Sequence, residues 1–266
     1  MEGLSLHHLS ASSANTYGEC ARRWKELYRD GLPRVVSPPL VFGSAWDLTV
    51  GRALRSPERG DVTVGSLLED WRAVWPECVG EAEATGRMDW GGDLPADLEN
   101  EGRLLCALPK TAEVLRAMRV RTERGDPALQ RRISLSVPGV PVPVIGFVDL
   151  WLEDGTVVDV KTARRPWAAS KPRTDLQPRV YLAALQQEGF PLSGLRFRHL
   201  VWVRGSRPQL QVLDTEFSQG ELFVALDALR ETWRGIAAGV FPPNFGCWRC
   251  GPACEVYRAG RCLGRR

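Results

Sequence analysis

The alternation of hydrophobic and polar positions predicts helices and strands in different parts of this 266-residue chain. Apolar residues recur at helical spacing in the first half, whereas short runs rich in Val, Ile, Leu and Trp follow from residue 130. We expect helices at residues 10–29, 42–54, 66–75, 98–124, 176–187 and 219–238. We expect strands at residues 130–138, 143–152, 156–162, 197–204 and 209–216.

The order of these elements predicts an α/β fold, a mixed central sheet with helices before, between and after its strands. With 44% apolar residues, the chain can bury the core of one domain spanning residues 1–266. We expect a mostly helical part at 10–125, an α/β core at 126–240 and a cysteine-rich region at 241–266. Residues 56–100 are rich in Gly, Pro and acidic residues and indicate a variable insertion.

Two neighbouring strands carry an acid and then an acid-x-lysine pattern. Asp149 lies in one strand, Asp159 and Lys161 lie in the next, and residues 153–156 give a hairpin turn signal. Side chains alternate along a strand, so Asp159 and Lys161 point to the same face. Asp149 shares that face only in a register with an even index sum, which favours a three-residue loop with Gly155 in the left-handed conformation.

Two nearby carboxylates repel each other unless a cation lies between them. Mg²⁺ or Mn²⁺ suits such a pair, because both ions prefer oxygen ligands and can bridge to a phosphate. Lys161 would then hold an attacking water or stabilise negative charge on phosphorus. The pattern therefore indicates a site that cuts phosphodiesters, and the alternative is an ordinary exposed hairpin that carries charges.

The acid, acid-x-lysine pattern resembles the PD-(D/E)XK nuclease superfamily, and flanking segments resemble its RecB-like branch. Cys20, which precedes a group of Arg, Trp and Tyr residues ending at Tyr28, is similar to the N-terminal helix of that branch. The branch also has a Q-x-x-x-Y signature, which Gln177 and Tyr181 match. The two signature side chains lie one helical turn apart. The resemblance implies DNA hydrolysis by a catalytic set of Asp149, Asp159, Lys161, Gln177 and Tyr181.

The segment ending at Asp47 resembles the one that supplies a third metal ligand in this family. The family usually has histidine there, so the resemblance implies three carboxylates, Asp47, Asp149 and Asp159, around Mg²⁺ or Mn²⁺. Alternatively, Asp47 is a solvated helix residue. Gln177 could equally precede a first helical turn at Pro178, and Tyr181 could be a packed aromatic with a wet hydroxyl.

Cysteine usage indicates a second metal site. Cys78 and Cys106 stand apart and are expected to be small buried hydrophobes. Four others fall within sixteen residues: Cys247, Cys250, Cys254 and Cys262. Such spacing indicates zinc or an iron-sulfur cluster, whereas the odd total of seven and the lack of a signal peptide argue against a disulfide scaffold.

Members of the RecB-like branch that carry a [4Fe-4S] cluster bind it with one N-terminal and three C-terminal cysteines. The resemblance therefore implies Cys20, Cys247, Cys250 and Cys254 as ligands, with Cys262 competing for the fourth place. The alternative is a Zn²⁺ site made only of the four C-terminal cysteines, with Cys20 a free thiol.

The net charge is +3, and nearly all positive charge is arginine, whose planar fork suits phosphate. The basic group after Lys161 is the best candidate for gripping a DNA backbone: Arg164, Arg165, Lys171 and Arg173. No run approaches the length of a membrane span, so we expect a cytoplasmic protein, prokaryotic or phage-encoded. No Walker-type loop is present, and thus no visible motor.

Together these features predict a metal-dependent DNA exonuclease that acts on single-stranded ends. It would work alone or with a separate helicase, recombination or CRISPR partner, in DNA repair or in a phage or CRISPR setting. The alternative is a catalytically inactive nucleic-acid-binding or assembly module that retains the zinc or iron-sulfur site. The departure at Asp47 is the main support for that alternative.

Overall fold

The computed structural model describes residues 6–55 and 62–262. Its main sheet has the strand order β3-β4-β5-β6-β7. Only β5 and β6 run parallel, and the other neighbours pair antiparallel. The strands are β3 (Leu129–Leu135), β4 (Val144–Trp151), β5 (Thr156–Ala163), β6 (Arg196–Val203) and β7 (Gln209–Thr215). The predicted mixed α/β fold is confirmed.

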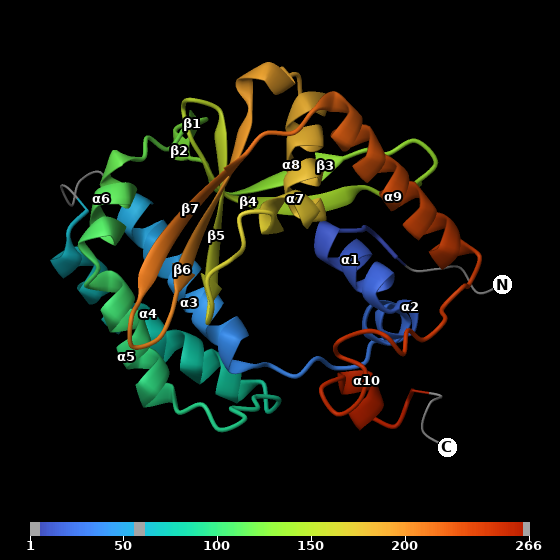
Figure 1. Cartoon of the computed structure of the whole chain (residues 1–266), viewed down its shortest axis with the longest axis horizontal. Helices are drawn as coiled ribbons and strands as arrows, with labels where there is room; N and C mark the ends of the chain where they lie inside the picture. Colours follow the sequence, from blue (N-terminus) through green and yellow to red (C-terminus); the bar gives the residue numbers. More distant parts are fainter. Residues whose placement is uncertain (1–5, 56–61, 263–266) are drawn as a thin grey trace.

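Helices cover both faces of this sheet (Figure 1). On one face lie α1 (Ala11–Glu19), α8 (Leu176–Gln187) and α9 (Gln219–Ala237). On the other lie α3 (Pro38–Arg55), α4 (Val64–Ala84), α5 (Pro95–Cys106) and α6 (Pro109–Ala117). Each face buries its own hydrophobic cluster, and β5 contributes to both, because Val157 faces the α8 side while Val158 and Val160 face the α3 side. We call these the α8-side and α3-side clusters.

The helix expected at residues 10–29 is interrupted at Cys20, whose backbone is extended. It continues as α2 (Ala21–Trp24) and a π-helical turn, η1 (Lys25–Arg29). The backbone N–H of Arg22 donates to the carbonyl of Pro242 at 3.1 Å. The C-terminal segment, which includes α10 (Glu255–Arg258), therefore contacts the chain where the N-terminal helix breaks.

The single helix expected at 98–124 is wrong, because the structure has two helices, α5 and α6, that meet at Leu108 and Pro109. Proline has no N–H for the helical ladder and its ring clashes with the preceding turn, so it starts a new helix instead of continuing one. After α6 the chain forms a two-stranded hairpin, β1 (Thr122–Glu123) and β2 (Asp126–Pro127).

The region interpreted as an insertion contributes to the core. Within it, α4 is longer than the predicted 66–75, and Trp71 and Trp75 on α4 are buried in the α3-side cluster. Residues 56–61 lie outside the described part of the chain. Two short helices complete the fold, α7 (Lys171–Thr174) and η3 (Leu192–Gly194). Among the described residues, no helix combines the length and apolar character needed to cross a membrane.

Candidate active site

The hairpin of β4 and β5 has the predicted turn. The backbones pair at Leu150 with Val158 and at Trp151 with Val157, a register that sets Asp149 across from Asp159. The N–H of Leu152 donates to the carbonyl of Thr156, which leaves three loop residues, 153–155. Gly155 has φ +85°, and a Cβ there would lie 1.9 Å from the carbonyl oxygen of Gly194. Glycine is therefore the only residue that fits at position 155 of this loop.

Beyond Leu150 the two strands separate, and the carboxylate of Asp149 lies between them. Its Oδ2 accepts a hydrogen bond of 2.8 Å from the backbone N–H of Val160. Its Oδ1 accepts one of 2.9 Å from Nε2 of Gln130 on β3. The side chain of Asp149 thus takes the place of the missing backbone ladder.

Asp159 is buried and brings three predicted residues together. Its Oδ1 accepts from Lys161 Nζ at 2.6 Å and from Gln177 Nε2 at 2.7 Å. The same amide nitrogen of Gln177 donates to the hydroxyl of Tyr181 at 3.0 Å. Gln177 and Tyr181 lie on α8, whose N-terminus is capped by the side chain of Asp175.

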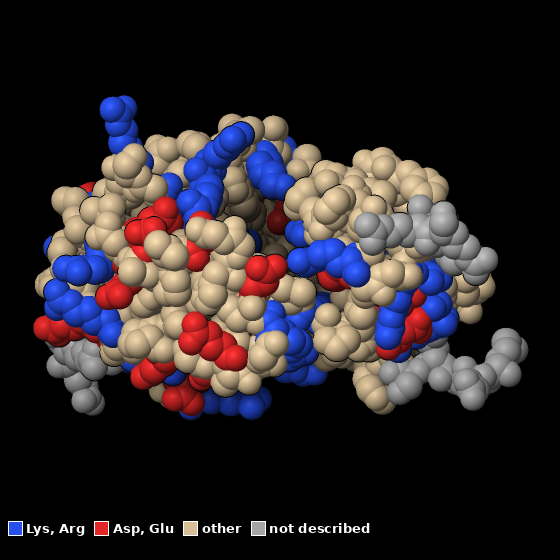
Figure 2. Space-filling view, turned by 90° about the horizontal axis from the view of Figure 1, so that it is seen from below, with Lys and Arg blue, Asp and Glu red and all other residues tan. Residues whose placement is uncertain are grey.

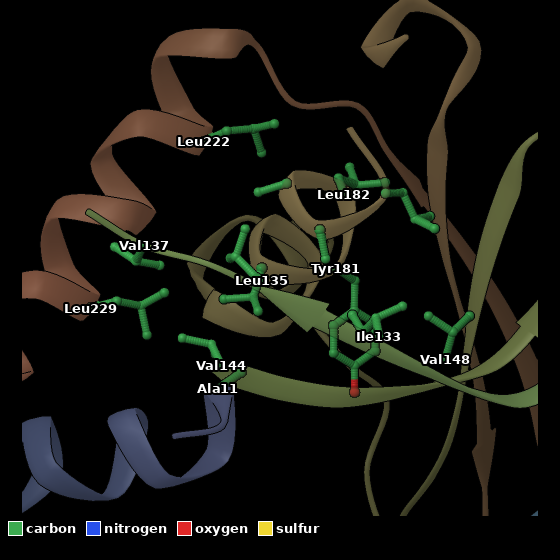
Figure 3. Packing of buried hydrophobic residues seen from close by; sticks show 14 of the residues in the cluster. Ala11, Ile133, Leu135, Val137, Val144, Val148, Tyr181, Leu182, Leu222 and Leu229 are labelled. Carbon is green, nitrogen blue, oxygen red and sulfur yellow. The ribbon is translucent and has the colours of Figure 1, made fainter. Parts of the chain in front are cut away.

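The ring of Tyr181 packs in the α8-side cluster with Ile133 and Val148, and its hydroxyl points out of that cluster (Figure 3). Gly146 on β4 makes room for the ring, because a Cβ there would lie 2.5 Å from Cε1 of Tyr181. Burial, followed by the charges of the nearby carboxylates, raises the pKa of Tyr181 to about 12. The hydroxyl therefore remains neutral and can donate its own hydrogen toward Asp159 or a ligand.

Asp47 reaches the same region from α3. It lines a cavity of about 570 Å³ together with Asp149, Gln130, Arg52 and Arg55. Burial and the charge of Asp149 raise the pKa of Asp47 to about 8. Burial and the charge of Asp159 raise the pKa of Asp149 to about 6.

Lys161 lies among these acids. Burial alone would lower the pKa of its ammonium, but Asp159, Asp149 and Asp47 outweigh burial and raise it. Lys161 therefore stays a cation and cannot accept a proton from water at neutral pH.

The donor set fits a hard divalent ion. Carboxylates supply the oxygen ligands that Mg²⁺ and Mn²⁺ prefer, and their mutual repulsion would be relieved by a cation. Oδ2 of Asp159 is buried without a hydrogen-bond partner in the described residues, so one oxygen is available as a ligand. In the described part of the chain, however, no three acidic, His or Cys side chains are already placed as a complete ligand group. The ammonium of Lys161 contacts Oδ1 of Asp159 and so occupies a position where a metal cation could bind.

The basic group expected to grip DNA is exposed but partly engaged with acids. Arg164 pairs with Asp93 at 2.6 Å and with Glu101 at 3.4 Å, and Arg173 pairs with Glu221 at 3.2 Å. The Lys171 ammonium lies 5.7 Å from the centre of the Trp167 ring, and Arg165 is exposed. Figure 2 shows a hollowed face with Lys and Arg side chains gathered along its rim.

Sequence reasoning missed four residues at this site. Gln130 bonds to Asp149, His199 on β6 lies beside Asp159, and Arg52 and Arg55 line the cavity with Asp47. The two arginines follow Asp47 by five and eight residues, and neither is the three- or four-residue spacing that places side chains on one helical face. No local signal marks Gln130 or His199 either.

The five candidate cluster cysteines meet in one place. Cys20, Cys247, Cys250, Cys254 and Cys262 all line one small cavity of about 30 Å³, and all are free thiols. Burial and the neighbouring cysteines raise the pKa of Cys250. Both candidates for the fourth ligand therefore border the same space as the other three, although their sulfurs do not form a ready ligand group among the described residues.

Polar contacts join the two chain ends around these cysteines. The N–H of Asn244 donates to Sγ of Cys20 at 3.5 Å, and its side-chain amide donates to the carbonyl of Glu19 at 2.9 Å. Arg23 pairs with Glu255 at 2.8 Å. Cys78 and Cys106 are buried in the α3-side cluster, as expected, and burial raises the pKa of Cys106 to about 12.

The site combines a mixed sheet whose strands separate at Asp149, an acid-x-lysine pair on the next strand and a Gln-Tyr pair on α8. Residues 8–259 match the PD-(D/E)XK nuclease superfamily, and the chain belongs to it. Nucleases of this superfamily generally use Mg²⁺ or Mn²⁺ and act on DNA.

A solved structure shows a similar fold. A provisionally assigned exonuclease from Eubacterium rectale is 15% identical, with a TM-score of 0.61, covering 97% of this chain and 89% of that one. The protein SSO0001 is 10% identical, with a TM-score of 0.35 and 96% coverage of each chain. The search of curated proteins found no match.

Proposed function

We propose that this chain is a metal-dependent DNA exonuclease of the RecB-like branch, a single domain that acts on single-stranded ends. The observation that carries the proposal is that Asp47 on α3 and Asp149 on β4 line one cavity, while Asp159 on β5 accepts a hydrogen bond of 2.6 Å from Lys161. The exonuclease and single-strand parts rest on the RecB-like resemblance. The assigned activity of the E. rectale protein agrees with the exonuclease part.

The three carboxylates would hold one or two Mg²⁺ or Mn²⁺ ions, which would supply positive charge to the scissile phosphate and lower the pKa of water. Hydrolysis forms a bond from the water oxygen to phosphorus and breaks the bond from phosphorus to a sugar oxygen. The water loses one proton to solvent and the leaving oxygen gains one.

This chain's own residues supply the rest of the chemistry. Lys161 remains protonated, so it orients the attacking water and stabilises negative charge on phosphorus instead of removing a proton. Gln177 holds Asp159 and Tyr181 in place through its amide. The DNA backbone would meet Arg164, Arg165, Lys171 and Arg173, with Arg52 and Arg55 at the cavity wall.

For the cysteine site we propose a [4Fe-4S] cluster bound by Cys20, Cys247, Cys250 and Cys254, with Cys262 competing for the fourth position. Its support is the shared cavity and the contacts that join the chain ends. Thiolates bind such clusters, and closing the chain ends would restrict the unfolded state. Anaerobically purified protein should be brown and contain iron and sulfide, whereas colourless protein loaded with zinc would favour a Zn²⁺ site.

A second candidate function is an inactive DNA-binding or assembly module that retains the cysteine site. The aspartate in place of the family's histidine and the lack of a preformed three-ligand group in the described residues favour it. In either case the chain would act in DNA repair, or in a phage or CRISPR setting, with a separate helicase or recombination partner supplying ends.

One comparison tests the exonuclease assignment. Purified protein with Mn²⁺ is incubated with a linear single strand, the same strand circularised, and a linear duplex. We expect rapid digestion of the linear single strand, slow digestion of the duplex and no digestion of the circle. Rapid cutting of the circle would show an endonuclease, and binding without cutting of any substrate would support the inactive module.

A further inference from the structure

Strand β3 is distorted directly beside the candidate site. Gln130 has φ +50°, in the left-handed region that residues other than glycine seldom adopt. Its neighbours Leu129 and Arg131 pair with Leu150 and Val148 in the regular register. The distortion is therefore confined to one residue within an otherwise paired strand.

At Gln130 and Asp149, the inward-facing residues of β3 and β4 switch from one hydrophobic cluster to the other. In a regular strand, residues two apart share a face, yet Val148 belongs to the α8-side cluster and Leu150 to the α3-side cluster. On β3, Ile133 lies in the α8-side cluster while Leu129 packs on the α3 side. Asp149 lies between the two faces, which is why its carboxylate reaches sideways to the N–H of Val160 on β5.

The side chain of Gln130 fixes the opposite side of that carboxylate. Its Nε2 donates to Oδ1 of Asp149 at 2.9 Å, and both residues line the cavity with Asp47. An ionised carboxylate has about four acceptor positions. With one bond on each oxygen, Asp149 is held from two directions and can still accept an ion from the cavity.

We propose that Gln130 is a positioning residue that turns Asp149 into the plane of the sheet and holds it ready to bind the divalent ion. The inference rests on the proposed metal-dependent function. A strained backbone persists only where its surroundings enforce it. At this position glycine would relieve the strain but could not supply the amide that holds Asp149.

The test compares the Gln130→Gly and Gln130→Ala variants with the wild-type chain by thermal unfolding in EDTA and by Mn²⁺ titration. The glycine variant should unfold at the same or a higher temperature, because its backbone accepts the left-handed conformation. Both variants should bind Mn²⁺ about 10- to 100-fold more weakly, the usual effect of removing a group that orients a metal ligand. The alanine variant should be the less stable of the two.

Arg124→Gly provides a matched control. Arg124 has φ +53° in the turn between β1 and β2, so this change relieves similar strain away from Asp149 and should leave Mn²⁺ affinity unchanged. If the wild type and Gln130→Gly bind Mn²⁺ equally, the role of Gln130 is overturned while the nuclease proposal stands. If the wild type neither binds Mn²⁺ nor cleaves DNA, both are overturned.

Discussion

Nε2 of His199 lies 3.8 Å from Oδ2 of Asp159, and neither atom has a hydrogen-bond partner in the described part of the chain. The two residues face each other in the parallel register of β5 and β6, and both are about 1% exposed. The imidazole packs against the rings of Phe197 and Trp167. Burial lowers the pKa of His199, so it stands beside the acid as a neutral ring.

A small approach of these two atoms would let His199 donate an N–H to Asp159 when that acid holds an ion. We expect His199→Phe to keep or raise the unfolding temperature, because an unsatisfied buried group is replaced by an apolar ring. It should weaken Mn²⁺ binding about tenfold, since the donor is lost. His199→Gln, which retains an N–H, should recover part of the affinity. Mn²⁺ titration would contradict this role if the phenylalanine variant bound like the wild type.

Gly146→Ala tests the packing of Tyr181 on β4. The added Cβ would lie 2.5 Å from the tyrosine ring, so the ring must move and its link to Gln177 must break. We expect a loss of about 1–3 kcal/mol in the free energy of unfolding, together with reduced cleavage. Gly18→Ala in α1 is the control, because nothing lies within 4 Å of its added Cβ. That variant should gain about 0.5–1 kcal/mol. Equal changes in the free energy of unfolding of the two variants, measured by denaturant unfolding, would show that Gly146 is not needed to pack Tyr181.

Lys161→Met separates chemistry from metal binding. Loss of the ammonium should lower the cleavage rate at least about 100-fold, because charge on phosphorus is no longer stabilised. Mn²⁺ affinity should stay the same or increase, because a competing cation leaves the acids. Lys110→Met, an exposed change on α6, should alter neither quantity. Equal losses of rate and affinity in Lys161→Met would instead mean that Lys161 only supports the fold of the site.

The metal-free protein should lose stability as pH rises. The pKa of Asp47 is about 8 in the folded chain, against about 3.9 unfolded, so between these values the folded state binds more protons. Through Asp47 the free energy of unfolding therefore falls with increasing pH up to about pH 8, where the contribution of this residue ends. Asp149 contributes only to about pH 6. His199, whose pKa is lowered, acts in the opposite sense below about pH 6.5.

Between pH 6.5 and 8 the decrease in the free energy of unfolding with pH should thus come mainly from Asp47. Denaturant unfolding in EDTA should show that Asp47→Asn reduces this decrease, whereas Glu231→Gln, an exposed acid on α9, leaves it unchanged. If the free energy of unfolding of Asp47→Asn kept the wild-type dependence on pH, the group that loses its proton in this range would not be Asp47.

The sequence predicted the parts of the site that depend on local spacing. The even register of Asp149 and Asp159 and the left-handed Gly155 follow from the hairpin pattern, and helix α8 has the predicted bounds. Pro109 also carried a local signal, but the helical periodicity on both sides of it concealed the break.

Other features depend on contacts between segments distant in sequence. The helix break at Cys20 involves the carbonyl of Pro242. The left-handed backbone of Gln130 lies beside the point where β4 separates from β5. His199 reaches Asp159 only because β5 and β6 pair in parallel, which no pattern within β6 reveals.

Digestion of end-labelled single-stranded DNA in Mn²⁺ by the wild type and by Asp149→Asn shows whether this site cleaves DNA. Thermal unfolding in EDTA must first show that both proteins are folded. We expect progressive shortening of the labelled strand by the wild type, its arrest by EDTA, and no digestion by Asp149→Asn. Digestion by Asp149→Asn at the wild-type rate, or an intact strand with wild-type protein that binds Mn²⁺, would contradict this expectation.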